Sequence, residues 1–163
     1  MPMNIGQIGS LATVLKRKFR WTFQVDNALD AWYVRMAGRP NLTIEELELN
    51  FRNERVYISG KPTWETITIT VVDVQQNDAL HTWFTNVYDY NTGLTGAATM
   101  GDPASQYKKT GILRMFDGGG SVIETWTLSG LWPQTINWGD LDYSSNETQD
   151  IEVTMRYDGA KRT

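Results

Sequence analysis

The chain has 163 residues, of which 40% are hydrophobic and 12% aromatic, and it contains no cysteine. This length suits a single domain spanning residues 1–163, and the lack of cysteine excludes disulfides and thiolate metal sites and fits assembly in a reducing cytoplasm. A formal net charge of −4 argues against nucleic-acid binding, which depends on basic groups, and no apolar run is long enough for a transmembrane helix.

Residues 1–18 are expected to form an N-terminal arm, and its start, Met-Pro-Met-Asn-Ile-Gly, lacks the charged region followed by an apolar run that marks a secretory signal. Apolar residues at helical spacing predict a short helix over 7–18. The first twenty residues hold no acid but several bases, namely Lys16, Arg17, Lys18 and Arg20. We interpret this basic cluster as a solvated flank or a contact to an acidic neighbouring subunit, in preference to a phosphate patch.

Two strands are predicted after the arm. Apolar residues alternate with polar ones from Phe19 to Val25, which is typical of a half-buried strand. A turn is expected at 27–30, followed by a second strand over 31–37. The run Gly-Arg-Pro-Asn at 38–41 is expected to end it.

The segment 42–60 supports two readings. Thr43 to Glu46 matches a capping box, which predicts a helix. Apolar residues also alternate from Leu47 to Phe51 and again at 56–58, on either side of a possible turn at 52–53, which predicts a hairpin. The local pattern alone leaves the choice between helix and hairpin open.

A strand and a helix follow. The run TWETITITVVDV at 63–74 is the clearest strand pattern in the chain. A helix is predicted over 77–90, beginning at Asn77, because apolar residues recur at i, i+3, i+4, i+7 and i+8 from Leu80. Residues 91–106 are rich in Gly, Thr and Ala and are expected to form a long loop.

The C-terminal half predicts further strands. A hairpin is expected from 107–116 and 121–128 around the turn Asp-Gly-Gly-Gly. A chain break at 130–133, a short strand near 136–138, a polar stretch at 142–150 and a last strand at 151–155 complete the pattern. The predicted fold class is therefore mainly β (β-rich α+β) and antiparallel, with one helix that has a clear apolar stripe.

No residue pattern predicts catalysis, a cofactor or a metal site. His81 is the single histidine and has no imidazole or thiolate partner in the sequence. The carboxylates of Glu45, Glu46 and Glu48 are interpreted as a solvated face, because neighbours on a strand point to opposite sides. The glycine run at 117–121 lacks the lysine of a phosphate-binding loop.

Two segments of the C-terminal third carry a more specific signal: Gly-Leu-Trp-Pro at 130–133 and LDYSSNETQDIEVT at 141–154. In this order they resemble the tail tube proteins of contractile-tailed (myovirus-type) bacteriophages, in which a G-x-W/F-P break precedes an acidic stretch and a strand of the form Q-x-(I/F)-E-V-T. Shorter matches are FQV at 23–25 and YKK at 107–109. The resemblance spans most of residues 19–157.

The resemblance implies an antiparallel β-sandwich or barrel, shared with Hcp-like inner-tube proteins, with one flanking helix. Hexameric rings would merge their sheets into an inner barrel, and the rings would stack into a tube. The resemblance also implies that 42–60 is a hairpin reaching the adjoining ring. The residues expected to make this stacking contact are Leu47, Leu49, Phe51, Arg52, Asn53 and Glu54.

Two further expectations concern charge. Glu46 and Glu48 share one face of the same strand and are candidates for lining an acidic lumen or the ring-to-ring surface, since an acidic lumen would repel DNA phosphates. Residues 158–163 depart from the family and are expected to form a short polar tail.

The implied function is that of a structural, non-enzymatic subunit of the phage tail tube, with no cofactor. Its partners would be copies of itself, the tail sheath protein, baseplate or tube-initiator proteins, the tail terminator, and the tape measure protein and DNA that pass through the lumen. It would be located in the virion after assembly in the host cytoplasm. The alternatives are the inner tube of a pyocin-like or type VI secretion system and, outside this class, a carbohydrate-binding module using surface tryptophans.

Overall fold

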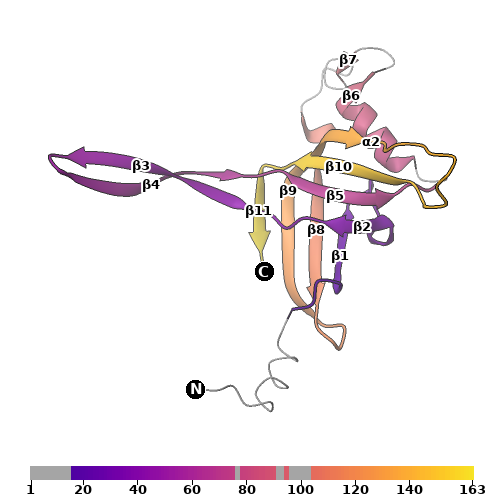
Figure 1. Ribbon diagram of the computed structural model, residues 1–163, viewed down its shortest axis with the longest axis horizontal. Coiled ribbons are helices and arrows are strands. Elements are labelled where there is room, and N and C mark those ends of the chain that lie inside the picture. Colours follow the sequence, from indigo (N-terminus) through magenta and orange to yellow (C-terminus); the bar gives the residue numbers. More distant parts are fainter. Residues whose placement is uncertain (1–15, 76–77, 91–93, 96–103) are drawn as a thin grey trace.

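The computed structural model describes residues 16–75, 78–90, 94–95 and 104–163 (Figure 1). Within these ranges, no helix is both long and apolar enough to cross a membrane. The predicted helix over 7–18 and most of the predicted loop at 91–106 lie outside the described residues. The elements are β1 (Trp21–Val25), η1 (Ala31–Tyr33), β2 (Val34–Ala37), β3 (Leu42–Phe51), β4 (Glu54–Trp64), β5 (Ile67–Val72), α2 (Ala79–Val87), β6 (Tyr88–Asp89), β7 (Leu94–Thr95), η2 (Ala104–Gln106), β8 (Lys109–Phe116), β9 (Val122–Asn137), β10 (Asp150–Arg156) and β11 (Gly159–Arg162).

The body of the subunit is an antiparallel sheet of seven strands, folded into two halves that run across each other (Figure 1). The strand order is β1-β8-β9-β10-β5-β2, and β11 pairs with β9 outside this path. Strand β9 belongs to both halves, because its first part pairs with β8 and β11 and its last part pairs with β10. The predicted mainly β, antiparallel fold is confirmed, although the sheet of the single subunit does not close into a barrel.

Strand alternation builds the core between the two halves. In β5, Ile67, Ile69 and Val71 are buried, and the residues between them are only partly buried. Phe23 and Val25 of β1 belong to the same core from the other half of the sheet. Successive side chains of a strand point to opposite faces, so apolar residues at every second position place one face of each strand in the core.

Helix α2 covers one end of this core. Of the predicted apolar stripe, Leu80 and Trp83 are buried, whereas Tyr88 is 43% exposed. The Trp83 indole N–H donates to the Tyr107 carbonyl at 2.6 Å. The helix is shorter than predicted: its N-cap is Asp78, and Tyr88 already belongs to the short strand β6. The predicted cap Asn77 lies outside the described residues.

The N-terminal strands differ from the prediction at their ends. Phe19 lies before β1 and is 72% exposed, although its place in the alternation predicted burial. The predicted strand over 31–37 begins with the 3-10 turn η1 and becomes a strand at Val34. The predicted strand over 63–74 is β5 for Ile67–Val72 alone, because the preceding Thr63 and Trp64 pair with β3 as the end of β4.

The predicted chain break at 130–133 is wrong, because β9 continues through it as one strand of 16 residues. Gly130 has a φ of 66°, and the pairing partner of β9 changes from β8 to β10 beside it. Pro133 follows at a shift in the register with β10, a position where a strand tolerates the missing N–H. Glycine and proline therefore mark a bend between the two halves of the sheet, not the end of a strand.

Substitution of Gly130 tests this bend. In Gly130→Ala the new Cβ would lie 2.1 Å from Oδ2 of Asp158 and would force alanine into a left-handed backbone conformation. We expect a loss of about 1–2 kcal/mol in the free energy of unfolding, most of it from the backbone, since the Asp158 side chain can move. Urea denaturation measures the loss; Gly119→Ala, with negative φ in an exposed turn, is the matched control and should change stability by less than about 0.5 kcal/mol.

The predicted polar tail at 158–163 is a strand instead. Gly159–Arg162 forms β11, which pairs with Trp126 to Ser129 of β9, and the N–H and C=O of Thr163 still bond to Thr125. Lys108 fixes the start of the strand through Asp158, with its Nζ 2.8 Å from Oδ2. Composition gave no strand signal because edge pairing satisfies backbone groups whatever the side chains are.

Candidate assembly surfaces

Strands β3 and β4 form a hairpin that projects far from the body of the subunit (Figure 1). The alternative of a helix over 42–60 is excluded, so the capping-box match at Thr43 is a false signal. Pairing from Leu42 with Trp64 to Phe51 with Glu54 satisfies the backbone and outweighs the local helical preference. The hairpin continues to Trp64, past the predicted end at Gly60.

One face of this hairpin is apolar. Leu47 pairs with Ile58 and Leu49 pairs with Val56, and residues paired across two strands lie on the same face. With Phe51 at the end, these side chains are between 45% and 70% exposed. We call this set the apolar hairpin face: Leu47, Leu49, Phe51, Val56 and Ile58.

The apolar hairpin face is a candidate contact surface. A two-stranded hairpin on its own is marginally stable in water, and a contiguous exposed apolar patch marks an interaction site. Three of its residues were predicted as contact residues from the resemblance, and the structure adds Val56 and Ile58. Their alternation was visible in the sequence, but only the register of the hairpin places them on the same face as Leu47 and Leu49.

The opposite face of the hairpin is polar. Glu46 and Glu48 share it, as their spacing predicted, and Tyr57 lies directly opposite Glu48. Arg55 pairs with Glu48, with 3.3 Å between Nε and Oε1. Glu46 has no ion-pair partner among the described residues, so this face carries free negative charge.

The tip of the hairpin is a two-residue turn. Arg52 has a φ of 57°, the positive value that tight hairpin turns favour at their first central residue. Its guanidinium lies 5.9 Å from the centre of the Phe51 ring. Asn53 completes the turn, and Glu54 pairs with Phe51. All the predicted contact residues therefore lie in the outer half of the hairpin.

A buried carboxylate forms a second distinctive group. Glu124 of β9 is 1% exposed and is the one charged residue buried in the described chain. Lys16 donates to its Oε2, Arg39 lies 2.5 Å from Oε1, and Arg162 lies 3.3 Å from Oε2. The Trp126 indole N–H also donates to Oε1 at 2.5 Å. The end of the N-terminal arm, the chain after β2 and the C-terminal strand are thus tied to one carboxylate.

These contacts determine the ionisation of Glu124. Burial alone raises the pKa of its carboxyl, but hydrogen bonds from Lys16, Trp126 and Arg39 outweigh burial and hold the pKa at about 2. Glu124 is therefore charged at neutral pH. No local sequence pattern indicates this role, since the partners of Glu124 are 108, 85 and 38 residues away. Of the basic cluster, Lys16 turns out to contact an acid of its own chain.

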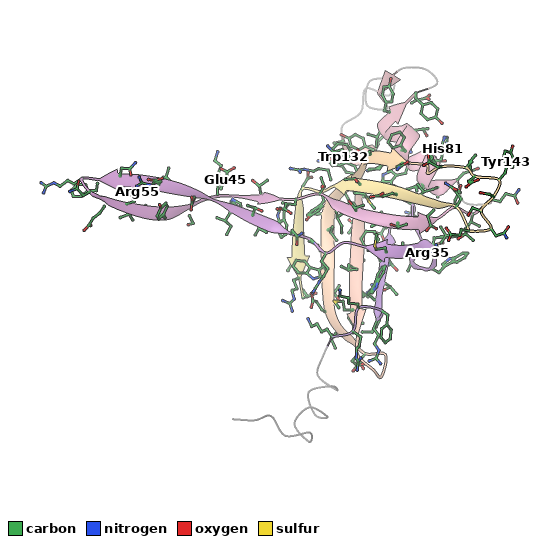
Figure 2. The ribbon with its side chains drawn as sticks, in the orientation of Figure 1. Arg35, Glu45, Arg55, His81, Trp132 and Tyr143 are labelled. Atoms are coloured by element: carbon green, nitrogen blue, oxygen red, sulfur yellow. The ribbon has the colours of Figure 1, made fainter. Side chains whose placement is uncertain are left out.

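His81 is partly buried and contacts two aromatic side chains. Its Nε2 lies 2.7 Å from the Tyr90 hydroxyl, and its ring centre lies 5.8 Å from that of Trp138. Within the described ranges, no group of His, Cys, Asp and Glu side chains could hold a metal ion. Of the tryptophans, Trp32 is 73% exposed and Trp138 is 43% exposed. The labelled side chains of Figure 2 show His81 on the side of the body away from the hairpin.

Comparisons with known proteins agree with this arrangement. The family described as "T4-like virus tail tube protein gp19" matches residues 17–161. The tail tube protein gp19 of Enterobacteria phage T4 is 31% identical over 117 residues, which is 71% of each chain. The tube-terminating cap of the anti-feeding prophage superposes with a TM-score of 0.72 at 14% identity, covering 91% of both chains.

Two further solved structures share the fold. A chain of the sheath–tube complex of an extracellular contractile injection system (PVC) has a TM-score of 0.71 at 15% identity and covers 99% of both chains. Hcp1 from Flavobacterium johnsoniae is more distant, with a TM-score of 0.52 at 12% identity over 88% of this chain and 94% of that one.

The family match and the relative in phage T4 identify a structural subunit of a tail tube. The chain belongs to the T4-like virus tail tube protein family. It is a tail tube protein of a contractile bacteriophage tail, and therefore a component of the virion.

Proposed function

We propose that the chain assembles into hexameric rings that stack into a hollow tube, inside a contractile sheath, through which DNA passes. The observation that carries this proposal is the apolar hairpin face, which projects from a subunit of the tail tube family and whose side chains are 45% to 70% exposed. Burial of this face against the next ring would stabilise the stacked arrangement of the rings.

Different residues of the hairpin would make different contacts in the assembled tube. Leu47, Leu49 and Phe51 would pack against the adjoining ring, and Arg52, Asn53 and Glu54 at the tip would make its polar contacts. Glu46 and Glu48 lie on the opposite face and would face the lumen or the ring surface. Carboxylates there would repel DNA phosphates and let the genome slide without sticking.

The remaining partners follow from the position of the tube in a tail. The sheath protein would surround it, baseplate or tube-initiator proteins would start it, and a terminator would end it. The tape measure protein and then DNA would occupy the lumen without specific binding. Assembly would take place in the cytoplasm of the host bacterium.

Electron microscopy of the purified protein tests the proposal. In negative stain, we expect hollow tubes with sixfold rings at high protein concentration, or on addition of tail-initiating components. Particles that stay monomeric under both conditions would contradict it.

Solved structures of this fold also include an extracellular contractile injection system, so the remaining alternative is that these phage-type tails act as injection particles without a genome. Purified particles distinguish the two functions. Capsids and DNA attached to the tails support the phage tail, whereas tails that never carry either support the injection particle.

A further inference from the structure

A cavity of about 430 Å³ lies where the two ends of the folded sheet come together. It is lined by residues of β1, β2 and β8 and by the end of the N-terminal arm. Its volume falls within the range that is usual for ligand-binding pockets. Strands β1 and β2 are the two ends of the strand order, and in the described chain each is paired on one side only. The cavity therefore occupies an open seam of the sheet.

The lining of this cavity combines positive charge with an apolar floor. Half of the lining residues are basic and none is acidic; the basic ones are Lys16, Arg17, Lys18, Arg35 and Arg39. Lys16 and Arg39 pair with Glu124 nearby, whereas Arg17 and Lys18 have no acidic partner in the described part of the chain. Trp21, Met36 and Leu113 supply apolar surface. We call this the basic seam cavity.

A segment of opposite character lies elsewhere on the subunit. Residues 138–149 connect β9 to β10 and contain Asp140, Asp142 and Glu147 but no basic residue. We call this segment the acidic loop. Its Leu141 is 90% exposed and its Tyr143 is 112% exposed, the most exposed large hydrophobic side chains of the described chain.

The acidic loop is held in a defined shape. Oδ1 of Asp142 accepts hydrogen bonds from the N–H and the hydroxyl of Ser144 at 2.9 and 2.8 Å, which forms a turn at the tip and lowers the pKa of Asp142. Gln149 donates to the Trp138 carbonyl at 2.7 Å and closes the base of the loop. These hydrogen bonds restrict the backbone of the loop that carries the exposed side chains of Leu141 and Tyr143. A restricted loop loses less conformational entropy when it binds.

The tip of the acidic loop points away from the sheet of its own chain, although the C-terminal end of the loop is tied to it. Arg35, on the cavity wall, donates to Asp150 at 2.7 Å and to Thr148 at 3.0 Å, and this fixes the C-terminal end of the loop. Figure 2 shows Tyr143 farther out than Arg35, pointing away from the sheet. The tip is therefore available to another molecule.

We propose that the acidic loop of one subunit docks into the basic seam cavity of a neighbouring copy, with Leu141 and Tyr143 on the apolar floor and the loop carboxylates beside Arg17 and Lys18. This inference rests on the proposed self-assembly into a tube. Opposite charge at the two surfaces selects this pairing and disfavours loop against loop. A head-to-tail contact of this kind closes rings or extends filaments, as repeated assembly requires.

Disulfide trapping tests the contact, and the absence of cysteine from the chain makes the background clean. Tubes are assembled from a mixture of Tyr143→Cys and Met36→Cys chains, each with a different tag, and then oxidised. Because each chain carries one cysteine, a bond between differently tagged chains can only join two subunits. Such a bond requires Cα atoms within about 7 Å. The control mixture replaces Met36→Cys with Val122→Cys, which is on β9, 50% exposed, and outside the cavity lining.

We expect at least about tenfold more mixed-tag dimer from the test mixture than from the control, because only the test mixture would bring its two cysteines within bonding distance. The inference is overturned if tubes form but the two mixtures crosslink equally. It is also overturned if a chain carrying both cysteines forms the bond within itself, because the loop then covers its own cavity. Failure of the unmodified protein to form tubes at all would instead contradict the proposed function on which the inference rests.

Charge exchange decides the question if the cysteine variants do not assemble. Arg17→Glu with Lys18→Glu should raise the protein concentration needed for assembly by about tenfold. Adding Asp140→Lys and Glu147→Lys to the same chain should restore assembly. Absence of a defect, or a defect that the exchange leaves unchanged, would overturn the contact.

Discussion

Replacing Leu49, Phe51 and Ile58 together by serine is expected to abolish tube formation while the subunit remains folded. In the single chain these side chains are 45%, 70% and 46% exposed, so they contribute little to its own core. Burying the exposed part of each in an assembly contact is worth about 1 kcal/mol, or about 3 kcal/mol together. The contact between rings should therefore weaken roughly 100-fold for each subunit.

Two measurements are needed for this triple variant. Sedimentation and electron microscopy report the loss of tubes, and urea denaturation reports the stability of the subunit, which should change by less than about 0.5 kcal/mol. The matched control is Asn50→Ser with Tyr57→Ser on the polar face of the same hairpin, which should still form tubes. Normal tubes from the triple variant would show that this face is not the stacking surface.

The second large effect is expected at Glu124. Glu124→Gln keeps the shape of the side chain but removes the charge that Lys16, Arg39 and Arg162 share. A carboxyl whose pKa falls from 4.5 to about 2 on folding corresponds to at most about 3 kcal/mol of stability. Because the cationic partners lie partly in solvent, we expect a loss of about 2 kcal/mol. The C-terminal strand and the arm should loosen together, since both are tied to this carboxylate.

The same carboxylate predicts how stability depends on pH. Its pKa in the folded subunit, about 2, lies below the ordinary value of 4.5, so the folded state binds the proton less readily than the unfolded chain. Its contribution is therefore complete above about pH 5 and is lost as the pH falls toward 2. The stability difference between the unchanged protein and Glu124→Gln should be constant from pH 5 to 8 and shrink below pH 4.5.

Urea denaturation at several pH values measures this difference. The control is Glu152→Gln, at an exposed position of β10, which should change stability by less than about 0.5 kcal/mol. If both variants lose the same stability, or if the Glu124→Gln difference grows as the pH falls, the carboxylate does not hold these segments together.

The strands with strong local patterns could be predicted from the sequence. The alternation in Ile67–Val72 and the hairpin around Asp117 appear where the residue types place them. Asp117 even closes the turn itself, accepting from the N–H groups of Gly119 and Ser121 at 2.8 Å. At these positions the types of the neighbouring residues in the chain are enough to determine the backbone conformation.

Part of the candidate assembly surface could also be predicted, but only through the resemblance. The spacing of Leu47, Leu49 and Phe51 fits a strand, while the residues before them fit a helix start, and both readings are local. The register that pairs Leu47 with Ile58 decides between them and completes the apolar face. Hydrogen bonding across two strands lies outside any short sequence window.

By itself, the sequence determined the antiparallel, mainly β class, the buried face of most strands and the absence of any recognisable catalytic pattern, because these depend on residue type and short periods. Only the tertiary structure decided that β9 bends at Gly130 without ending, that the polar C-terminal residues pair as β11, and that Glu124 gathers three cations from distant segments. Each of these features depends on contacts between residues far apart in the chain, and a short sequence pattern does not identify such distant partners.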